Sequence, residues 1–156
     1  MNLIGNGTHD LLQHRDQLDR LVADPGLDKN AVEELLRYDS PVQITARTAY
    51  EEIEIGGHSV APGSAVIALL GAANRDPQRF QDPDRLDVGR SEGSPLSFSS
   101  GIHYCLGAAL ARLEFAVVLD RLLDRFPTWE LVGGPPRHRD SLTLRGLVDL
   151  RVRFGS

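Results

Sequence analysis

The stretch Phe98-Ser99-Ser100-Gly101-Ile102-His103-Tyr104-Cys105-Leu106-Gly107 decides how this sequence is interpreted. It places Cys105, the single cysteine of the chain, between a loop that contains Gly101 and the start of an apolar segment with helical periodicity. The unpaired N–H groups and the positive dipole end at a helix N-terminus stabilise a thiolate. Cys105 is therefore a candidate nucleophile or metal ligand. The alternative is a buried cysteine that packs as a small hydrophobic side chain.

The segments on either side of this stretch differ in character. Residues 106–126 carry so many apolar positions that they predict a mostly buried helix, which Pro127 ends. Residues 74–100 carry prolines and many charges but no sustained period. A segment of this length is too long for an ordinary connection in a compact domain, so it predicts a structured functional loop.

The first forty residues predict helices. Apolar residues from 3 to 22 recur at helical spacing, and no capping residue precedes Met1, so this region is interpreted as a helix that is entered midway. A second helix is predicted to begin at a cap, either Asp28 or Asn30, and to stop at Ser40-Pro41.

The hydrophobic period changes to two in the middle of the chain and again in its tail. This period predicts short strands at 42–46, at 53–55, around 60, at 129–132, at 142–144 and at 150–154, and a buried strand at 65–70. The chain contains no internal repeat.

Composition excludes several classes of function. The chain has 156 residues, with 17 Lys and Arg against 22 Asp and Glu, so its formal net charge is −5. No basic cluster is present to hold nucleic-acid phosphates. The longest small and apolar stretch, 65–73, falls short of the ~20 residues that a membrane span requires. A lone cysteine and the absence of an export signal predict a cytoplasmic protein.

The stretch quoted first closely resembles the heme-ligand loop of the cytochromes P-450. The resemblance implies that the Cys105 thiolate is the proximal ligand of the iron in heme b, iron protoporphyrin IX. It also assigns four other cofactor-binding positions in the loop. Phe98 would pack beside the sulfur, and Gly101 would permit the tight turn. His103 would meet a heme propionate, and Gly107 would let the following helix run close under the porphyrin.

A second motif, Glu34-Leu35-Leu36-Arg37, resembles the Glu-x-x-Arg signature of the same family. Its i, i+3 spacing puts both charges on one helix face. The family adds an arginine from the long loop, and Pro83-Asp84-Arg85-Leu86 stands at that place. The resemblance thus implies that Glu34, Arg37 and Arg85 pin the loop by bidentate hydrogen bonds. The alternative is a solvated surface pair that contributes under ~1 kcal/mol.

Two further positions follow from the resemblance. Arg47, in a strand region, is the expected second partner for a propionate, although a solvated strand face would also accommodate it. Ser99 departs from the glycine that is usual in the family. If this position requires a positive φ, the serine costs on the order of 1 kcal/mol.

The resemblance implies a mainly α fold with small β-sheets (α+β). Residues 1–156 are expected to be a single partial domain, the C-terminal, heme-proximal part of the cytochrome P-450 fold. Met1 would fall within the family's long distal helix. The acid and alcohol pair that delivers protons to bound oxygen would lie upstream of it, so no catalytic side chain is expected in this chain.

The implied function is that of a heme-thiolate monooxygenase, which inserts one oxygen atom from O₂ into a small organic substrate with electrons from a ferredoxin or reductase. We expect no nucleic-acid or membrane partner, and we expect the isolated chain to be inactive. One alternative is a noncatalytic remnant, or a half-protein that needs a separate N-terminal chain. Another is a cysteine hydrolase with His103 as its base.

Overall fold

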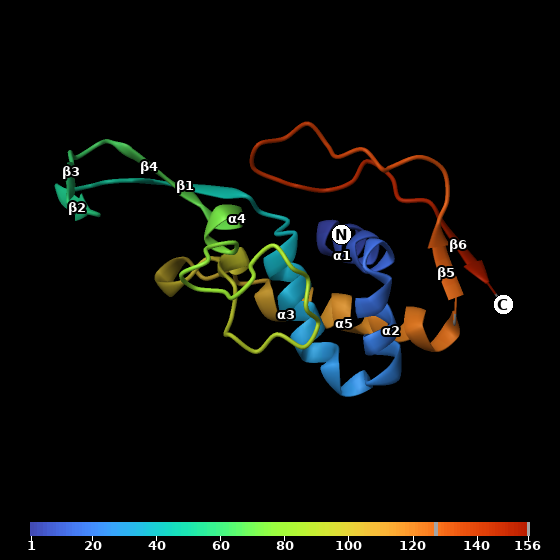
Figure 1. Cartoon of the computed structure of the whole chain (residues 1–156). Coiled ribbons are helices and arrows are strands. Elements are labelled where there is room, and N and C mark those ends of the chain that lie inside the picture. The colour runs from blue at the N-terminus through green and yellow to red at the C-terminus, as the bar shows by residue number, and fades with distance from the viewer. Residues whose placement is uncertain (127, 156) are drawn as a thin grey trace.

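Three helices form the body of the molecule in the computed structural model, which describes residues 1–126 and 128–155. Helix α1 (Asn2–Gln13) packs against α3 (Asp28–Tyr38) and α5 (Ala108–Arg125), and α3 also packs against α5 (Figure 1). The model confirms a mixed architecture of helices and small sheets. Pro127, the predicted end of the last helix, lies outside the described residues.

The first predicted helix is in fact two helices, α1 and α2 (Arg15–Ala23). The break falls at His14, whose φ of −117° and ψ of 71° are not helical. The ring Nδ1 of His14 lies 2.8 Å from the carbonyl oxygen of Asp10, at the end of α1. The periodicity continues through the break, and only the local conformation of His14 separates the two helices.

Helix α3 ends at Tyr38, as its stop signal predicted, but neither predicted cap holds its start. A short 3₁₀ turn, η1 (Pro25–Leu27), leads directly into it. The side chain of Asp24 caps that turn by accepting a 2.9 Å hydrogen bond from the Gly26 N–H. The capping interaction thus lies one turn earlier than predicted.

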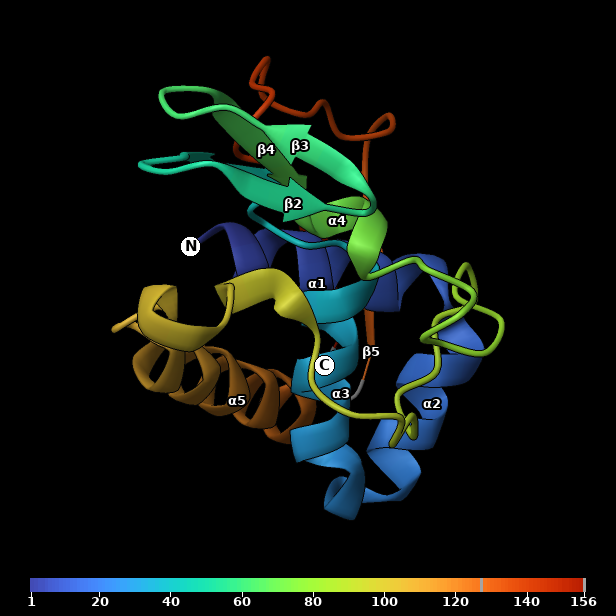
Figure 2. The ribbon, with the colours of Figure 1, turned by 90° about the vertical axis from the view of Figure 1, so that its left-hand side faces the viewer.

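Strands β1 (Ile44–Thr48) and β4 (Ala65–Leu69) form an antiparallel ribbon. The hairpin of β2 (Ile53–Ile55) and β3 (His58–Val60) lies at the far end of this ribbon, away from the helices (Figures 1 and 2). The strand predicted at 65–70 is confirmed over 65–69, but its predicted burial is wrong, because the described residues cover little of either face of this ribbon and β4 is largely exposed. Leu70 begins the short helix α4 (Leu70–Ala73).

The tail forms a second hairpin, of β5 (Thr128–Leu131) and β6 (Val152–Gly155), at the opposite end of the molecule (Figure 1). The predicted strand at 142–144 is absent from the described structure. A single β-bridge joins Leu144 to Val42 instead. The intervening tail therefore lies across the start of β1 without extending a sheet.

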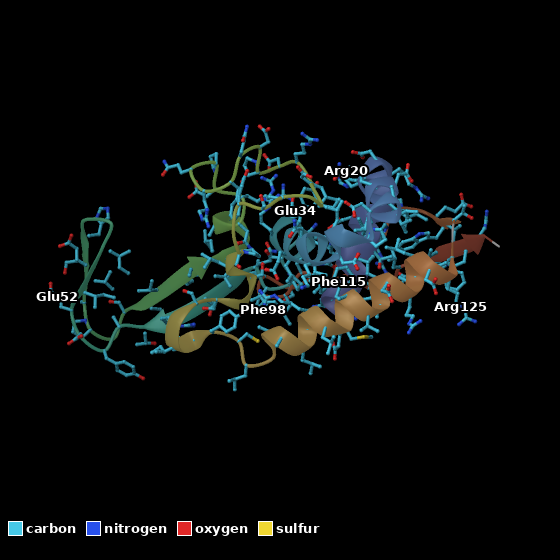
Figure 3. The ribbon with its side chains drawn as sticks, turned by 90° about the horizontal axis from the view of Figure 1, so that it is seen from below. Arg20, Glu34, Glu52, Phe98, Phe115 and Arg125 are labelled. Carbon is cyan, nitrogen blue, oxygen red and sulfur yellow. The ribbon has the colours of Figure 1, made fainter. Side chains whose placement is uncertain are left out.

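The hydrophobic core lies between the helices. Its buried members come from α1, α2, α3, the long loop, α5 and β5: Leu3, Leu11, Leu12, Leu18, Leu21, Ala31, Val32, Leu35, Leu36, Leu86, Val88, Phe115, Leu119 and Trp129. Figure 3 shows Phe115 directed from α5 toward the other helices.

Helix α5 is much less buried than predicted. Only Ala108, Phe115 and Leu119 are buried along its length, because α1 and α3 pack against one side of it. The opposite side is apolar and exposed, and carries Leu106, which precedes the helix, and Leu110, Leu113 and Val117. Among the described residues, no helix is both long and apolar enough to cross a bilayer.

Candidate functional site

The loop from Phe98 to Cys105 closes on itself at the start of α5. It contains two 3₁₀ turns, η2 (Leu96–Phe98) and η3 (Gly101–His103). The Cys105 N–H donates a 3.0 Å hydrogen bond to the carbonyl oxygen of Phe98, and the Ala108 N–H donates to the carbonyl oxygen of Cys105 at 3.2 Å. Cys105 is exposed. This exposure contradicts the alternative in which it packs as a buried hydrophobic residue.

Two residues of this loop have positive φ angles, Ser99 at +62° and Gly101 at +61°. Glycine adopts such a conformation without strain, whereas serine does not. A Cβ atom at Gly101 would meet no other atom within 4 Å, so conformation rather than space is what glycine supplies there. At Gly107 a Cβ atom would lie 3.8 Å from Cys105 Sγ, an ordinary contact.

Helix α3 holds the long loop through a buried ion pair. Arg37 Nε lies 2.7 Å from Glu34 Oε2, and both side chains are 1% exposed. Arg37 Nη1 also donates to the carbonyl oxygens of Asn74 and Pro83, each at 2.8 Å. The pair is therefore not the solvated surface bridge of the alternative interpretation, and its arginine pins the loop through main-chain acceptors. Figure 3 shows Glu34 within the body of the molecule.

The second arginine beside this pair is Arg90, not Arg85, so that prediction is wrong. Arg90 Nε lies 3.0 Å from Glu34 Oε2, whereas Arg85 offers its carbonyl oxygen to Arg37 Nη2 at 3.2 Å. Burial lowers the pKa of Arg90, but the carboxylates of Glu34 and Glu92 together more than offset this and raise it above the usual value. Spacing alone could not identify Arg90, because both arginines lie in the same irregular segment.

A buried polar cluster, which the sequence did not reveal, connects the start of the cysteine loop to α3. Asn74 Nδ2 donates to Ser40 Oγ at 2.7 Å and to Ser97 Oγ at 2.8 Å. The carbonyl oxygen of Leu36, in α3, accepts a 2.6 Å hydrogen bond from Ser97 Oγ. The Leu96 N–H donates to Asn74 Oδ1 at 2.7 Å, so this cluster fixes turn η2.

A second, partly exposed cluster joins the cysteine loop to α5 and α3. Arg112 of α5 donates from Nη1 to Tyr104 OH at 2.8 Å, and its guanidinium carbon lies 4.7 Å from the centroid of the Phe98 ring. Glu33 of α3 accepts hydrogen bonds from Nε and Nη2 of the same arginine. The hydrogen bonds to Glu33 raise the pKa of Arg112 above its usual value. The only signal in the sequence was an arginine within an apolar helical segment.

The two residues predicted to meet propionates lie on separate elements. Arg47 is half-buried on β1, where Nη1 donates to Thr45 Oγ1 and to the Ala46 carbonyl oxygen, each at 2.7 Å. His103 is exposed at the end of η3. Their assignment to propionates stays a prediction.

The surface near Cys105 is largely apolar. Ile102 and Leu106 are almost fully exposed on either side of the cysteine in the sequence. A cavity of about 330 Å³ also borders the loop, with Leu3, Val42, Phe98 and Ala111 among its lining residues. An exposed thiol therefore stands among apolar surfaces.

Comparisons with known proteins agree with these features. The family model described as Cytochrome P-450 matches residues 21–148. The chain is 47% identical over 154 residues to the Biotin biosynthesis cytochrome P-450 of Bacillus subtilis (strain 168). It is 48% identical over 156 residues to the 6-deoxyerythronolide B hydroxylase of Saccharopolyspora erythraea. Each alignment covers 99% of this chain and 39% of the relative, so the chain spans about two-fifths of their length.

A solved structure shows the same arrangement. The crystal structure of P450BioI in complex with an acyl carrier protein that carries hexadec-9Z-enoic acid superimposes with a TM-score of 0.95 at 47% identity. The match covers 99% of this chain and 40% of that chain.

Proposed function

Because the chain belongs to the cytochrome P-450 family, we propose that it supplies the thiolate-bearing part of a heme-thiolate monooxygenase, which inserts one oxygen atom from O₂ into a small organic substrate. The observation that carries this proposal is the exposed Cys105 thiol at the N-terminus of α5. The loop that presents the thiol is fixed through Asn74 and through Arg112.

The residues present suit heme b. The exposed sulfur of Cys105 could bind the iron, exposed Ile102 and Leu106 could offer apolar surface to the macrocycle, and Arg47 and His103 could pair with its carboxylates. When bound, heme would supply the iron chemistry of oxygen activation, which belongs to the cofactor.

The chain's own residues perform three tasks in this proposal. Cys105 would bind the iron through its exposed sulfur, which lies just before the N-terminus of α5. The buried Glu34–Arg37 pair holds the long loop. It contacts Asn74, whose side chain in turn fixes turn η2 at the start of the cysteine loop. Arg47 and His103 would hold the cofactor through its propionates.

The partners belong to the same proposal. Electrons would come from a ferredoxin or reductase, as is general for the family. The substrate is proposed only as a small organic molecule, and the cytoplasmic location stays a prediction. P450BioI was solved in complex with an acyl carrier protein ligated to hexadec-9Z-enoic acid, so an acyl chain on a carrier protein is one kind of small organic group that this proposal includes.

The test uses a chimera in which this chain replaces the matching 39% of the Bacillus subtilis relative. We expect the chimera to bind heme and, after reduction and addition of carbon monoxide, to show the red-shifted Soret band of thiolate ligation. The same chimera with Cys105→Ser should lose that band. Retention of the band in the serine variant would sink the assignment of Cys105.

Two alternatives predict different results. A noncatalytic remnant would give a chimera that folds without thiolate-bound heme. A cysteine hydrolase would cleave esters without heme, with His103 as base. Within residues 1–126 and 128–155, His103 makes no hydrogen bond to Cys105, so no observation favours the hydrolase.

A further inference from the structure

Arg112 contacts both ends of the loop that closes on Cys105. It donates to the hydroxyl of Tyr104, the residue before the cysteine, at 2.8 Å. It also lies against the ring of Phe98, whose carbonyl oxygen accepts the Cys105 N–H. The guanidinium of Arg112 therefore contacts Phe98, at which the loop begins, and Tyr104, which directly precedes the last residue of the loop.

The other side of the guanidinium is anchored on α3. Glu33 accepts a hydrogen bond from Nε, and its other oxygen accepts one from Nη2 at 3.1 Å. The Arg112 and Glu33 side chains are only 26% and 29% exposed. A two-pronged, largely covered pair orders its partners better than a single exposed ion pair does. Glu33 also precedes Glu34, so adjacent residues of α3 anchor the cysteine loop and the long loop.

We propose that Arg112, tethered to Glu33, is a positioning residue that holds Phe98 and Tyr104 and thereby fixes the orientation of Cys105 as a metal ligand. The identity of the metal group, heme iron, rests on the proposed function.

The three contacts require the shape of arginine. A planar guanidinium can donate in a fork to a carboxylate, donate to a hydroxyl and lie over an aromatic ring at the same time. A lysine ammonium carries the same charge but cannot make this set of contacts. The proposal therefore predicts that Arg112→Lys behaves like Arg112→Gln. A role of charge alone predicts that the lysine variant behaves like the parent.

The decisive experiment measures backbone amide hydrogen exchange in the heme-free 156-residue chain. In Arg112→Gln and Arg112→Lys we expect the hydrogen-bonded amides within residues 98–107, those of Ser99, Tyr104 and Cys105, to exchange on the order of tenfold faster. Amides of α3 should keep the parent rate. The matched control is Arg121→Gln, an exposed arginine on the same helix, which should leave exchange in residues 98–107 unchanged.

Three results would overturn the proposal. One is parent-like exchange of residues 98–107 in Arg112→Gln. Another is equal acceleration in α3, which would indicate general destabilisation. The third is normal exchange in Arg112→Lys. A parallel heme titration of the chimera described above separates this inference from the proposed function: at equal heme content, Arg112→Gln should give a smaller thiolate-type Soret fraction than the parent chimera. If the parent chimera gives no thiolate band, the proposed function fails, while hydrogen exchange in the 156-residue chain still decides whether Arg112 positions the loop.

Discussion

Ser99 is held in a conformation that favours glycine. Its φ of +62° with ψ of −161° lies in a region that only glycine populates readily. We expect Ser99→Gly to raise the free energy of unfolding by about 1 kcal/mol, after allowance for the greater freedom of glycine in the unfolded chain. The measurement is urea denaturation followed by the fluorescence of Trp129, the single, buried tryptophan.

Ser100 provides the matched control, because its φ of −153° is ordinary extended backbone. Ser100→Gly should gain nothing and lose a few tenths of a kcal/mol. Equal effects of the two substitutions would show that the conformation of Ser99 is not strained.

Asp10 gives the stability of the chain a pH dependence. Burial, and then the nearby Asp39, raise the pKa of Asp10 to about 7 from a usual value of 3.8. Its Oδ2 has no hydrogen-bond partner among the described residues. Between pH 4 and 7 the folded state therefore binds more protons than the unfolded state, so stability from this group falls as pH rises through that window and levels off above it.

Asp10→Asn should remove this loss. Its stability relative to the parent should rise by about 2 kcal/mol between pH 5.5 and pH 8, measured by denaturation at both pH values. The control Asp19→Asn changes an exposed carboxylate of α2 and should show no such growth. A constant difference between Asp10→Asn and the parent at both pH values would refute the titration of Asp10.

At the scale of elements, Gly7 sets the approach of α1 to α5. A Cβ atom at Gly7 would lie 2.5 Å from Cζ of Phe115, a ring that is buried and cannot move freely. We expect Gly7→Ala to destabilise the chain by about 1 to 3 kcal/mol, because overpacking exceeds the gain in helix propensity. Thermal unfolding by circular dichroism measures the effect.

Gly5, on the same helix, is the control. A Cβ atom there would meet nothing within 4 Å. Gly5→Ala should therefore stabilise the chain by up to about 1 kcal/mol. If both alanines were stabilising, Phe115 would be able to yield and the close approach would carry no energy.

The sequence predicted those features that spacing along one element encodes. Glu34 and Arg37 are three residues apart, and this separation places them on one face of α3 wherever the helix packs. The sequence could not predict that Arg90, and not Arg85, contacts Glu34, because the irregular loop has no period that fixes side-chain direction. The sequence also identified α5 and β4 as apolar elements. Their burial could not be predicted, because an apolar pattern does not say which other residues cover it.

At the scale of the whole molecule, the exposed side of α5 should dominate solution behaviour. Leu106, Leu110, Leu113 and Val117 form an apolar stripe, with the last three 50 to 60% exposed. Contiguous exposed apolar surface promotes association. We expect the chain to bind a hydrophobic dye and to self-associate as its concentration rises, measured by sedimentation velocity.

Replacing Leu113 and Val117 by Gln should reduce both effects without loss of helix content, since neither side chain belongs to the core. A parent that stays a monomer without bound dye at high concentration would show that this stripe does not promote association.

We also expect the chain alone to bind heme weakly and to show no monooxygenase turnover.

Iron-edge X-ray absorption on the heme-loaded chimera described above tests most directly whether Cys105 binds the heme iron. We expect a sulfur atom in the first coordination shell of the parent chimera. We expect only nitrogen or oxygen neighbours in the Cys105→Ser chimera at equal heme content. A first shell without sulfur in the parent, or the same sulfur in both proteins, would show that Cys105 is not the ligand.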